Sequence, residues 1–339
     1  MKKILIVLLA AVCSLAQAQQ LPHFSQYMLN GYLINPAVAG SENYGEAKVG
    51  YRNQWTGLEG APKSYYLTLQ MPISKIDRNT TAATLPSRDR NSRKFLYRKY
   101  MHDEIRMAEP HHGVGLTAIA DKAGALSRSD IGLTYAYHLP LNTTMNMSVG
   151  LSGGVSVYNI DQRLLLLSNP SDPAFTDGGY NRVKPNITAG ALLYSKRFYI
   201  GVTTAQVLQD ELTPGQTDLE KQNRSYMHSY LTGGYKVVLS KDLSLLPSVL
   251  LKYVRSSSVS ADANLKVLFS DKIWAGCSYR HNDAVILLGG VNVNNMFQLG
   301  YAYDMASGRI SKSGYGSHEV VLGILLNNKA RIYSPSDFW

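Results

Sequence analysis

Apolar and polar residues alternate one by one in many separate segments of this chain, and this pattern limits the folds open to it. In the segment 44–55, Val49 and Tyr51 alternate with Lys48 and Arg52. Successive side chains of a β-strand point to opposite faces of the sheet, so a period of two predicts strands with one apolar and one polar face. Each segment has about ten residues, the length that a tilted strand needs to cross a bilayer.

Alternating segments can be followed along the whole chain. An even number of antiparallel strands is typical of a closed barrel made from one chain. We therefore predict an all-β fold, an antiparallel transmembrane β-barrel of about 14 strands. The predicted strands are 44–55, 64–73, 112–122, 128–139, 144–158, 184–195, 197–206, 228–240, 243–255, 257–270, 271–281, 283–293, 295–304 and 317–327.

The first residues have the three regions of a cleaved signal peptide. Lys2 and Lys3 precede an apolar stretch over 4–12, and Ala16–Ala18 offers small residues at the cleavage positions. We predict that residues 1–18 are the signal peptide and that the mature chain starts at 19. A lipoprotein signal ending at Cys13 is the alternative, which the bulky residue before that cysteine disfavours.

The signal peptide and the cysteine content further limit the kind of protein that this chain can be. After the signal peptide one cysteine remains, Cys277, so the mature fold has no internal disulfide. Cys277 stands at one of the apolar positions of its alternating segment, which predicts that its side chain contacts lipid. No later apolar run reaches the roughly 18 residues of a transmembrane helix, and a chain that crosses a membrane without such helices needs a closed barrel. The formal charge of +10 would suit nucleic acid or an acidic surface, but export excludes nucleic acid as a partner.

The links between predicted strands differ in length. The long links 159–183, 207–227 and 305–316 fall at one end of the barrel, which we predict to be external. The link 74–111 falls at the opposite, periplasmic end. It is a basic insertion that is either a solvated loop or a docking surface for a periplasmic partner or anionic envelope material. Its cations are Arg88, Arg90, Arg93, Lys94, Arg98 and Lys99.

The polar positions of the alternating segments, which would face the inside of the barrel, carry charges of both signs. This predicts a wet or partly plugged interior. The members are Glu46, Lys48, Arg52, Lys236, Asp262, Lys266, Lys272 and Arg280. Residues 19–43 precede the barrel as an N-terminal arm, and its Phe24, Tyr27, Tyr32 and Ile34 are too apolar to remain in water. We predict that the arm packs in or under the barrel, with contact to a partner as the alternative.

Catalytic and metal-binding patterns are missing from the sequence. His111 and His112 are neighbours at a strand start, so their side chains point to opposite faces and do not bind one metal ion. Neither a Gly-x-Ser-x-Gly elbow nor a His-Glu-x-x-His motif is present. We therefore expect no enzyme activity, no cofactor and no metal site.

Four short motifs lie near the N-terminus: Phe24–Met28, Asn35–Gly40, Tyr51–Trp55 and Gly60–Tyr65. They resemble the opening of the PorP/SprF family, outer-membrane proteins of the type IX secretion system of Bacteroidetes, and the resemblance is dense over Gln20–Tyr66. It implies partner-binding residues within these motifs. The expected residues are Phe24, Gln26, Tyr27, Asn35, Pro36, Gly40, Arg52, Asn53, Gln54, Trp55, Pro62 and Tyr65.

The resemblance also implies a location and partners. The chain would reside in the outer membrane, surrounded by its lipid, and bind or anchor exported proteins that carry a C-terminal sorting domain. It would contact the periplasmic ring lipoprotein and the peptidoglycan-binding component of the secretion system. A passive diffusion porin for small solutes is the alternative function, and a stable plug formed by residues 20–43 would argue against it. A barrel enzyme acting on lipid has no motif in its favour.

Overall fold

A computed structural model describes most of the chain, and its described residues form one continuous sheet. They are 22, 24–42, 44–73, 110–142, 145–164, 180–195, 197–208, 227–240, 242–254, 259–270, 272–281, 283–293, 296–307 and 316–326. The strands are β1 (Gly45–Asn53), β2 (Lys63–Ile73), β3 (His111–Ala123), β4 (Leu126–Pro140), β5 (Met145–Ile160), β6 (Tyr180–Ser195), β7 (Phe198–Ala205), β8 (His228–Tyr235), β9 (Val237–Val238), β10 (Leu243–Val254), β11 (Ser260–Phe269), β12 (Ile273–Arg280), β13 (Ala284–Asn292), β14 (Phe297–Ala306) and β15 (Ser317–Leu326).

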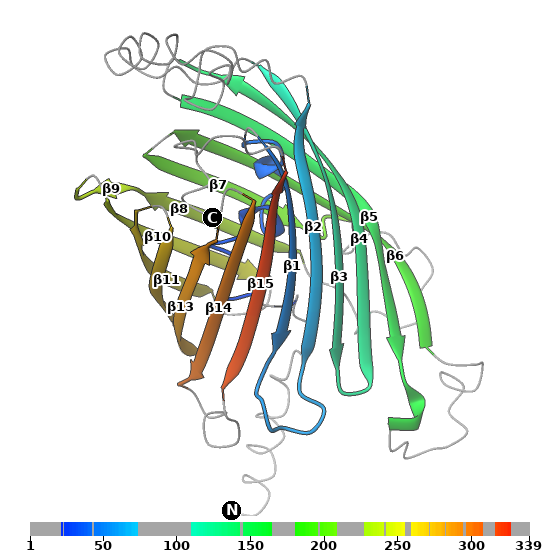
Figure 1. The fold of residues 1–339 in the computed structure, drawn as a ribbon. Helices are drawn as coiled ribbons and strands as arrows, with labels where there is room; N and C mark the ends of the chain where they lie inside the picture. The colour runs from blue at the N-terminus through cyan, green and yellow to red at the C-terminus, as the bar shows by residue number, and fades with distance from the viewer. Residues whose placement is uncertain are drawn as a thin grey trace, which may run out of the picture.

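The sheet closes on itself (Figure 1). Each strand pairs antiparallel with its neighbours in the sequence, β15 pairs with β1, and β10 pairs with β11. β8 and β9 both pair with β10, and Lys236 lies between them with its backbone N–H donating to the Arg197 carbonyl at 2.7 Å. They occupy one position in the wall, so the barrel has 14 strand positions, as predicted.

Some predicted boundaries were wrong by a few residues. The segment 228–240 is interrupted at Lys236, although β8 and β9 keep one register with β10 on either side of it. β3 begins at His111, so the insertion predicted over 74–111 is one residue shorter at that end. Residues 74–109 lie outside the described part of the chain. Strand ends are set by pairing with neighbours, which a single segment's alternation does not reveal.

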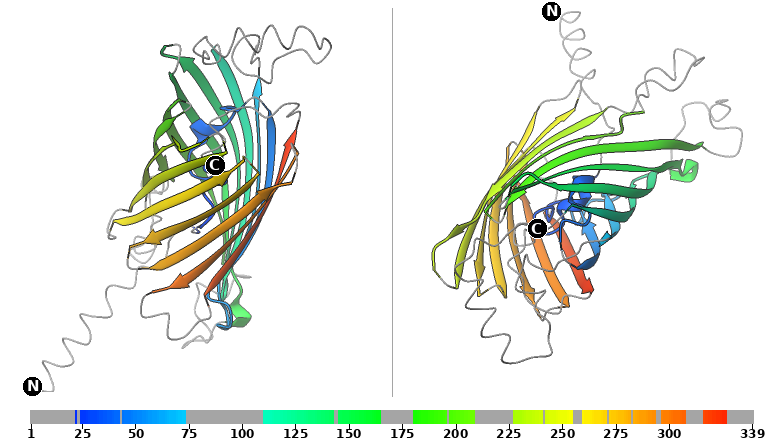
Figure 2. Two further views of the ribbon diagram at one scale, coloured as in Figure 1. Left: turned by 60° about the vertical axis from the view of Figure 1, so that its left-hand side comes forward. Right: turned by 90° about the horizontal axis from the view of Figure 1, so that it is seen from above.

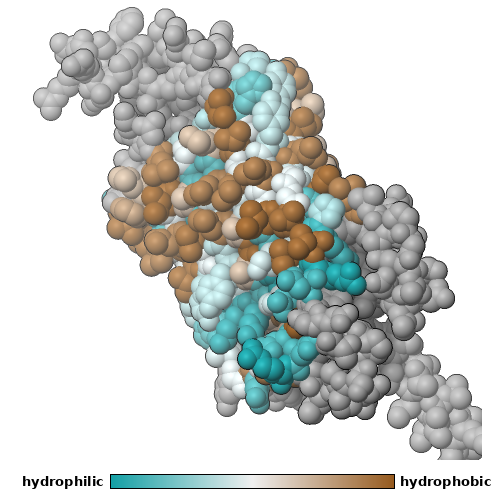
Figure 3. Space-filling model, turned by 90° about the vertical axis from the view of Figure 1, so that its right-hand side faces the viewer, coloured by the Kyte–Doolittle hydropathy of each residue, from teal (hydrophilic) through white to brown (hydrophobic). Residues whose placement is uncertain are grey.

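The outer face of the barrel is apolar. Val49, Leu133, Leu151 and Ile200 are exposed on it, at 66% for Leu133. On the face that lies to the right in Figure 1, apolar side chains form a band, and hydrophilic ones gather below it (Figure 3). Cys277 is exposed on this outer face, as its phase predicts. Such a surface suits contact with lipid, as in outer-membrane barrels.

The inner face carries the predicted charges, with one correction. Glu46, Lys48, Arg52, Lys236, Asp262, Lys266 and Arg280 are buried. Lys272 was wrongly assigned to this set, because it lies in the turn before β12 and is exposed. Within the described residues, no helix has the length and apolarity required to cross a membrane.

The N-terminal arm lies inside the barrel, as predicted (Figure 2). It contains two short 3-10 helices, η1 (Gly31–Leu33) and η2 (Pro36–Val38). Its apolar side chains pack with inward side chains of the wall in one buried core, to which the arm contributes Tyr27, Met28, Leu29, Tyr32, Ala37, Val38 and Ala39. A third 3-10 helix, η4 (Gln162–Leu164), follows β5.

Strand directions define two rims. The proximal rim is the end where β1 begins and where Ile73 and His111 lie; the distal rim is the end where β5 finishes and β6 begins. The strands that flank the basic insertion meet at the proximal rim. Those that flank 165–179, 209–226 and 308–315 meet at the distal rim, which confirms that these links and the insertion leave from opposite ends. Which rim faces outward stays a prediction.

Candidate functional site

The first turn of the arm binds a charged cluster near the distal rim. The backbone N–H of Ser25 donates to Glu319 Oε2 at 2.7 Å, and its hydroxyl donates to Asp304 Oδ2 at 2.6 Å. Gln26 Nε2 donates to the Glu319 backbone carbonyl at 2.8 Å. Asp304 is on β14 and Glu319 is on β15, so the first turn of the arm is attached to two neighbouring strands of the wall.

Arg52 forms ion pairs with both acids. Its Nη2 lies 2.6 Å from Asp304 Oδ2, and its Nη1 lies 3.0 Å from Glu319 Oε2. The Arg52 Nη1 also donates to the Ser25 hydroxyl at 2.7 Å. Arg52 and Glu319 are direct cross-strand partners on β1 and β15. Because Arg52 is only 3% exposed, the pairing is what makes this buried cation stable.

The middle of the arm is held by polar groups from both sides of the barrel. Lys48 Nζ lies 2.6 Å from Glu46 Oε1 and donates a hydrogen bond to the Leu29 carbonyl of the arm. Asn30 Nδ2 donates to Thr68 Oγ1 at 2.8 Å, and Tyr32 donates to Thr134 Oγ1 at 2.7 Å. Tyr27 accepts a hydrogen bond from Asn264 of β11 across the lumen. The arm therefore spans the lumen instead of lining one side of it.

The Asn-Pro motif shapes the next turn. The Asn35 side chain accepts from the Ala37 backbone N–H at 2.9 Å and so caps η2, which Pro36 begins. Asn35 Nδ2 donates to the Ala191 carbonyl of β6 at 3.0 Å, and Ser148 of β5 donates to the Ala37 carbonyl at 2.7 Å. The motif thus fixes both the turn and its distance from the wall.

Two inward glycines let the arm backbone approach the wall. A Cβ at Gly113 would lie 1.8 Å from the Ala39 carbonyl oxygen, and one at Gly150 would lie 2.5 Å from the Pro36 carbonyl carbon. No side chain fits at either position. Neither contact was predicted, because the spacing of these glycines in the sequence says nothing about a segment that crosses the lumen.

Two histidines clamp the end of the arm near the proximal rim. His111 Nε2 lies 3.0 Å from the Gly40 carbonyl oxygen and His138 Nε2 lies 2.8 Å from the Ala39 carbonyl oxygen. Their rings are stacked, with centroids 4.5 Å apart. Since a carbonyl only accepts, each Nε2 carries the proton, and His138 Nδ1 accepts from the Tyr194 hydroxyl at 2.8 Å. His112 points away from this pair toward Tyr135, as its strand position predicts.

The predicted partner-binding residues fall into three groups. The first group lies where the arm meets the wall and consists of Phe24, Gln26, Tyr27, Asn35, Pro36, Gly40 and Arg52. The second group lies in or next to the β1–β2 turn at the distal rim and consists of Asn53, Gln54, Trp55 and Pro62. The third is Tyr65 alone, which lies on the outer face beside Tyr51. In the turn, the Trp55 backbone N–H donates to the Ser317 hydroxyl at 3.1 Å. The six predicted cations of the insertion lie outside the described residues. Partner binding by any of these residues stays a prediction.

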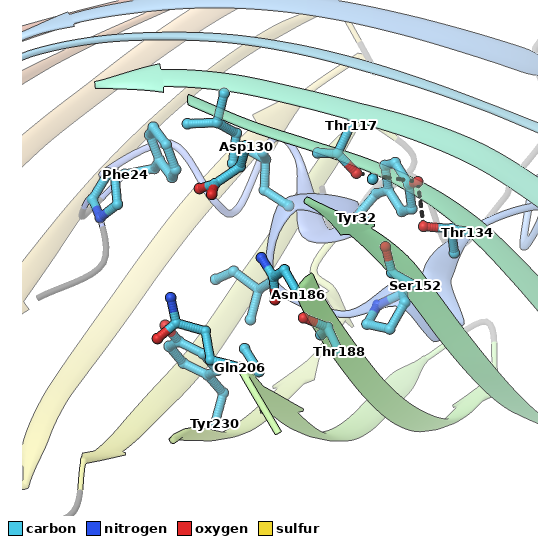
Figure 4. A pocket seen from close by; sticks show the side chains of 18 of the residues that line it. Phe24, Tyr32, Thr117, Asp130, Thr134, Ser152, Asn186, Thr188, Gln206 and Tyr230 are labelled. Atoms are coloured by element: carbon cyan, nitrogen blue, oxygen red, sulfur yellow. Dashed lines mark hydrogen bonds between the residues drawn. The ribbon is translucent and has the colours of Figure 1, made fainter. Parts of the chain in front are cut away.

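A pocket of about 140 Å³ remains between the arm and the wall, and we call it the vestibule. Figure 4 shows Phe24 and Tyr32 of the arm on one side, with Asn186, Thr188 and Gln206 from the wall. Its wall residues come from the middle and distal parts of β3 to β6 and from the distal halves of β7, β8 and β10 to β12, so the vestibule extends from the middle of the lumen into its distal half. No pattern in the sequence predicted this pocket.

The charges that line the vestibule are paired. Arg128 Nε lies 2.9 Å from Asp130 Oδ2, and Arg280 Nε lies 3.1 Å from Asp262 Oδ2. The Arg128 guanidinium also lies over the Tyr158 ring, 5.2 Å from its centroid. In the part of the chain that the structure describes, no three His, Cys, Asp or Glu side chains are grouped so as to hold a metal ion.

Comparisons with known proteins give one family match. The family model for the type IX secretion system membrane protein PorP/SprF matches residues 16–324. Among solved structures, CymD, a monoaromatic hydrocarbon channel, is 11% identical, with 89% of this chain and 92% of that chain covered and a TM-score of 0.47. A Pseudomonas aeruginosa FadL homologue is 11% identical over 93% and 96%, with a TM-score of 0.45. Acinetobacter baumannii Omp33 is 9% identical over 85% and 99%, with a TM-score of 0.43. No curated protein matches.

Proposed function

Because the chain belongs to the PorP/SprF family of type IX secretion system membrane proteins, we propose that it binds or anchors exported proteins at the cell surface. These would be proteins with a C-terminal sorting domain. The chain is an outer-membrane β-barrel, with an apolar outer face and a closed wall. Its role is binding, not catalysis, and it needs no cofactor.

The plugged lumen is the observation that supports a binding role over a channel. The arm forms hydrogen bonds or ion-pair contacts with β1, β2, β4, β6, β11, β14 and β15. A passive diffusion porin requires a continuous aqueous path, and a segment attached on all sides of the lumen obstructs it. On this proposal the vestibule is a binding pocket and not part of a pore.

The two rims suit two kinds of partner. The exported protein would meet the distal rim, where the vestibule lies. The periplasmic ring lipoprotein and the peptidoglycan-binding component would meet the proximal rim, which the basic insertion adjoins in sequence. The cations at 88–99 would attract an acidic partner surface, and such attraction weakens with salt.

Affinity purification tests this function. A tagged chain would be purified from detergent-solubilised outer membrane, and its co-purified proteins identified by mass spectrometry. We expect a protein with a C-terminal sorting domain, the ring lipoprotein, or both. An unrelated barrel with the same tag is the control. A chain that recovers neither partner, yet conducts ions in planar bilayers, would favour the diffusion porin.

A further inference from the structure

We propose that the vestibule holds an uncharged peptide segment of the exported protein, with an apolar side chain against the arm and a backbone amide against the wall. This inference rests on the proposed function and names the site at which that function takes place. The segment would be a loop or chain end that enters from the distal rim.

The shape of the wall makes room for a chain segment. Thr117, Gly132, Gly154 and Asn186 form one row of cross-strand neighbours over β3 to β6. The two middle positions are glycines, so no side chain projects from them, and β4 and β5 pack closely there: a Cβ at Gly154 would lie 2.0 Å from the Ile131 carbonyl oxygen. All four residues line the vestibule. A recess between two polar ends accommodates a backbone that runs along the wall.

Apolar side chains form one side of the vestibule. Leu33, Ile34 and Pro36 of the arm line it, as do Ile119 of β3 and Leu250 of β10. Leu33, Ile34 and Ile119 pack against the buried core. These aliphatic side chains favour an apolar side chain of the ligand in this half of the pocket, because its burial releases water from the pocket and from the ligand.

Hydroxyl groups form a row on the other side. Thr134, Ser152 and Thr188 are direct cross-strand neighbours on β4, β5 and β6, and all three line the vestibule. Hydroxyls both donate and accept hydrogen bonds, so they satisfy a peptide group in either orientation. Thr134 already accepts a hydrogen bond from Tyr32, but a purely apolar ligand, such as an acyl chain, would offer no hydrogen-bond partner to Ser152 and Thr188, at a cost in free energy.

Charge complementarity selects against ionic ligands. The four charges of the vestibule are already joined in two ion pairs, Arg128 with Asp130 and Arg280 with Asp262. A charged group would be buried beside neutral pairs without a counterion of its own, which is unfavourable. An uncharged segment meets no such penalty.

Two polar atoms of lining residues have no hydrogen-bond partner among the described residues. They are Asn186 Oδ1, an acceptor, and Arg280 Nη2, a donor. Buried polar atoms are nearly always paired in folded proteins. A peptide group offers both the N–H and the C=O that these atoms lack. Asn186 is on β6 and Arg280 is on β12, so two different parts of the lining each lack a partner of the kind that a backbone amide offers.

Filling the vestibule tests the proposal. Ser152→Trp and Thr188→Trp place a large ring in the recess, and Val183→Trp is the matched control on the outer face of β6, where Val183 is 65% exposed. Heat-modifiable migration would first verify that each variant forms a barrel. Binding of the purified exported protein to the detergent-solubilised chain would then be measured. We expect at least a tenfold loss of affinity for either filling variant and none for the control.

A photocrosslinker at Ser152 gives a readout that survives a folding failure of the tryptophan variants. We expect adducts to an uncharged segment of the exported protein, mapped by mass spectrometry. Adducts to lipid or polysaccharide alone, or full affinity in both filling variants, would overturn the inference and leave the proposed function standing. Failure of the unaltered chain to bind any exported protein would overturn both.

Discussion

At the residue scale, Arg52 links three parts of the molecule that are distant in sequence. Its guanidinium contacts Ser25 of the arm, Asp304 of β14 and Glu319 of β15. The alternation of β1 predicts that Arg52 points inward, but it does not predict the acids that it meets. They belong to the last two strands, which lie beside β1 only because the barrel closes.

Replacement of Arg52 should destabilise the barrel strongly. In Arg52→Gln, Asp304 and Glu319 would remain buried without their cation, at a cost of about 3–5 kcal/mol. We expect unfolding at lower urea concentration, followed by loss of heat-modifiable migration. Lys63→Gln, which removes an exposed cation at the start of β2, should have little effect. Equal midpoints for the two variants would contradict the importance of the cluster.

A single methyl group at Gly113 should displace the arm. Its Cβ would meet the Ala39 carbonyl oxygen at 1.8 Å, so the arm must move away from β3. In Gly113→Ala we expect faster protease cleavage within 24–42 and higher conductance in planar bilayers. Gly153→Ala is a suitable comparison, because no heavy atom lies within 4 Å of its added Cβ. If Gly113→Ala keeps the arm as protected as Gly153→Ala does, the close contact is not essential.

At the element scale, the arm and the wall depend on each other to different degrees. The strands close the barrel by pairing with one another, with β15 on β1 and β10 on β11, so closure itself does not involve the arm. The arm, in contrast, has no strand pairing and is held by side chains that belong to the wall. Its apolar residues are buried only because the barrel surrounds them.

Deletion of residues 22–42 should therefore open the lumen without abolishing the barrel. We expect a heat-modifiable protein in the outer membrane, with larger single-channel conductance than the unaltered chain. A Gly-Ser segment of the same length in place of the arm separates the loss of specific contacts from the loss of chain length. Failure of both variants to assemble would show that the arm is required for folding, not only for plugging.

Strand β12 offers a test of the outer face. Cys277 is exposed toward lipid, and a cation in the middle of the bilayer costs roughly 2–4 kcal/mol. Cys277→Arg should lower the yield of assembled barrel, as judged by heat-modifiable migration. Cys277→Leu, which keeps the site apolar, should assemble normally. Normal assembly of the arginine variant would mean that β12 does not face the bilayer core at this point.

At the scale of the whole molecule, the direction of the strands predicts the topology. If the proximal rim is periplasmic, links 165–179 and 209–226 are external and the basic insertion is internal. Protease added to intact cells should cut the first two and spare the sites between Arg88 and Lys99. Permeabilised cells are the control in which all sites become accessible. Cleavage at 88–99 in intact cells would reverse the orientation.

The sequence by itself determined the wall. Alternation with a period of two predicted the strands, their number and which side chains of β1, β11 and β12 point inward, because each of these follows from local backbone geometry. The turn position of Lys272 and the break at Lys236 were missed, since the ends of strands are set by pairing with the neighbouring strand.

Only the tertiary structure decided what the interior contains. The apolar arm predicted burial, but its contacts with His111, His138 and Glu319 join residues up to 294 positions apart. The vestibule is the space left between arm and wall, and its lining comes from nine strands. Such a space depends on how distant segments pack in three dimensions, and no local pattern of residues carries that information.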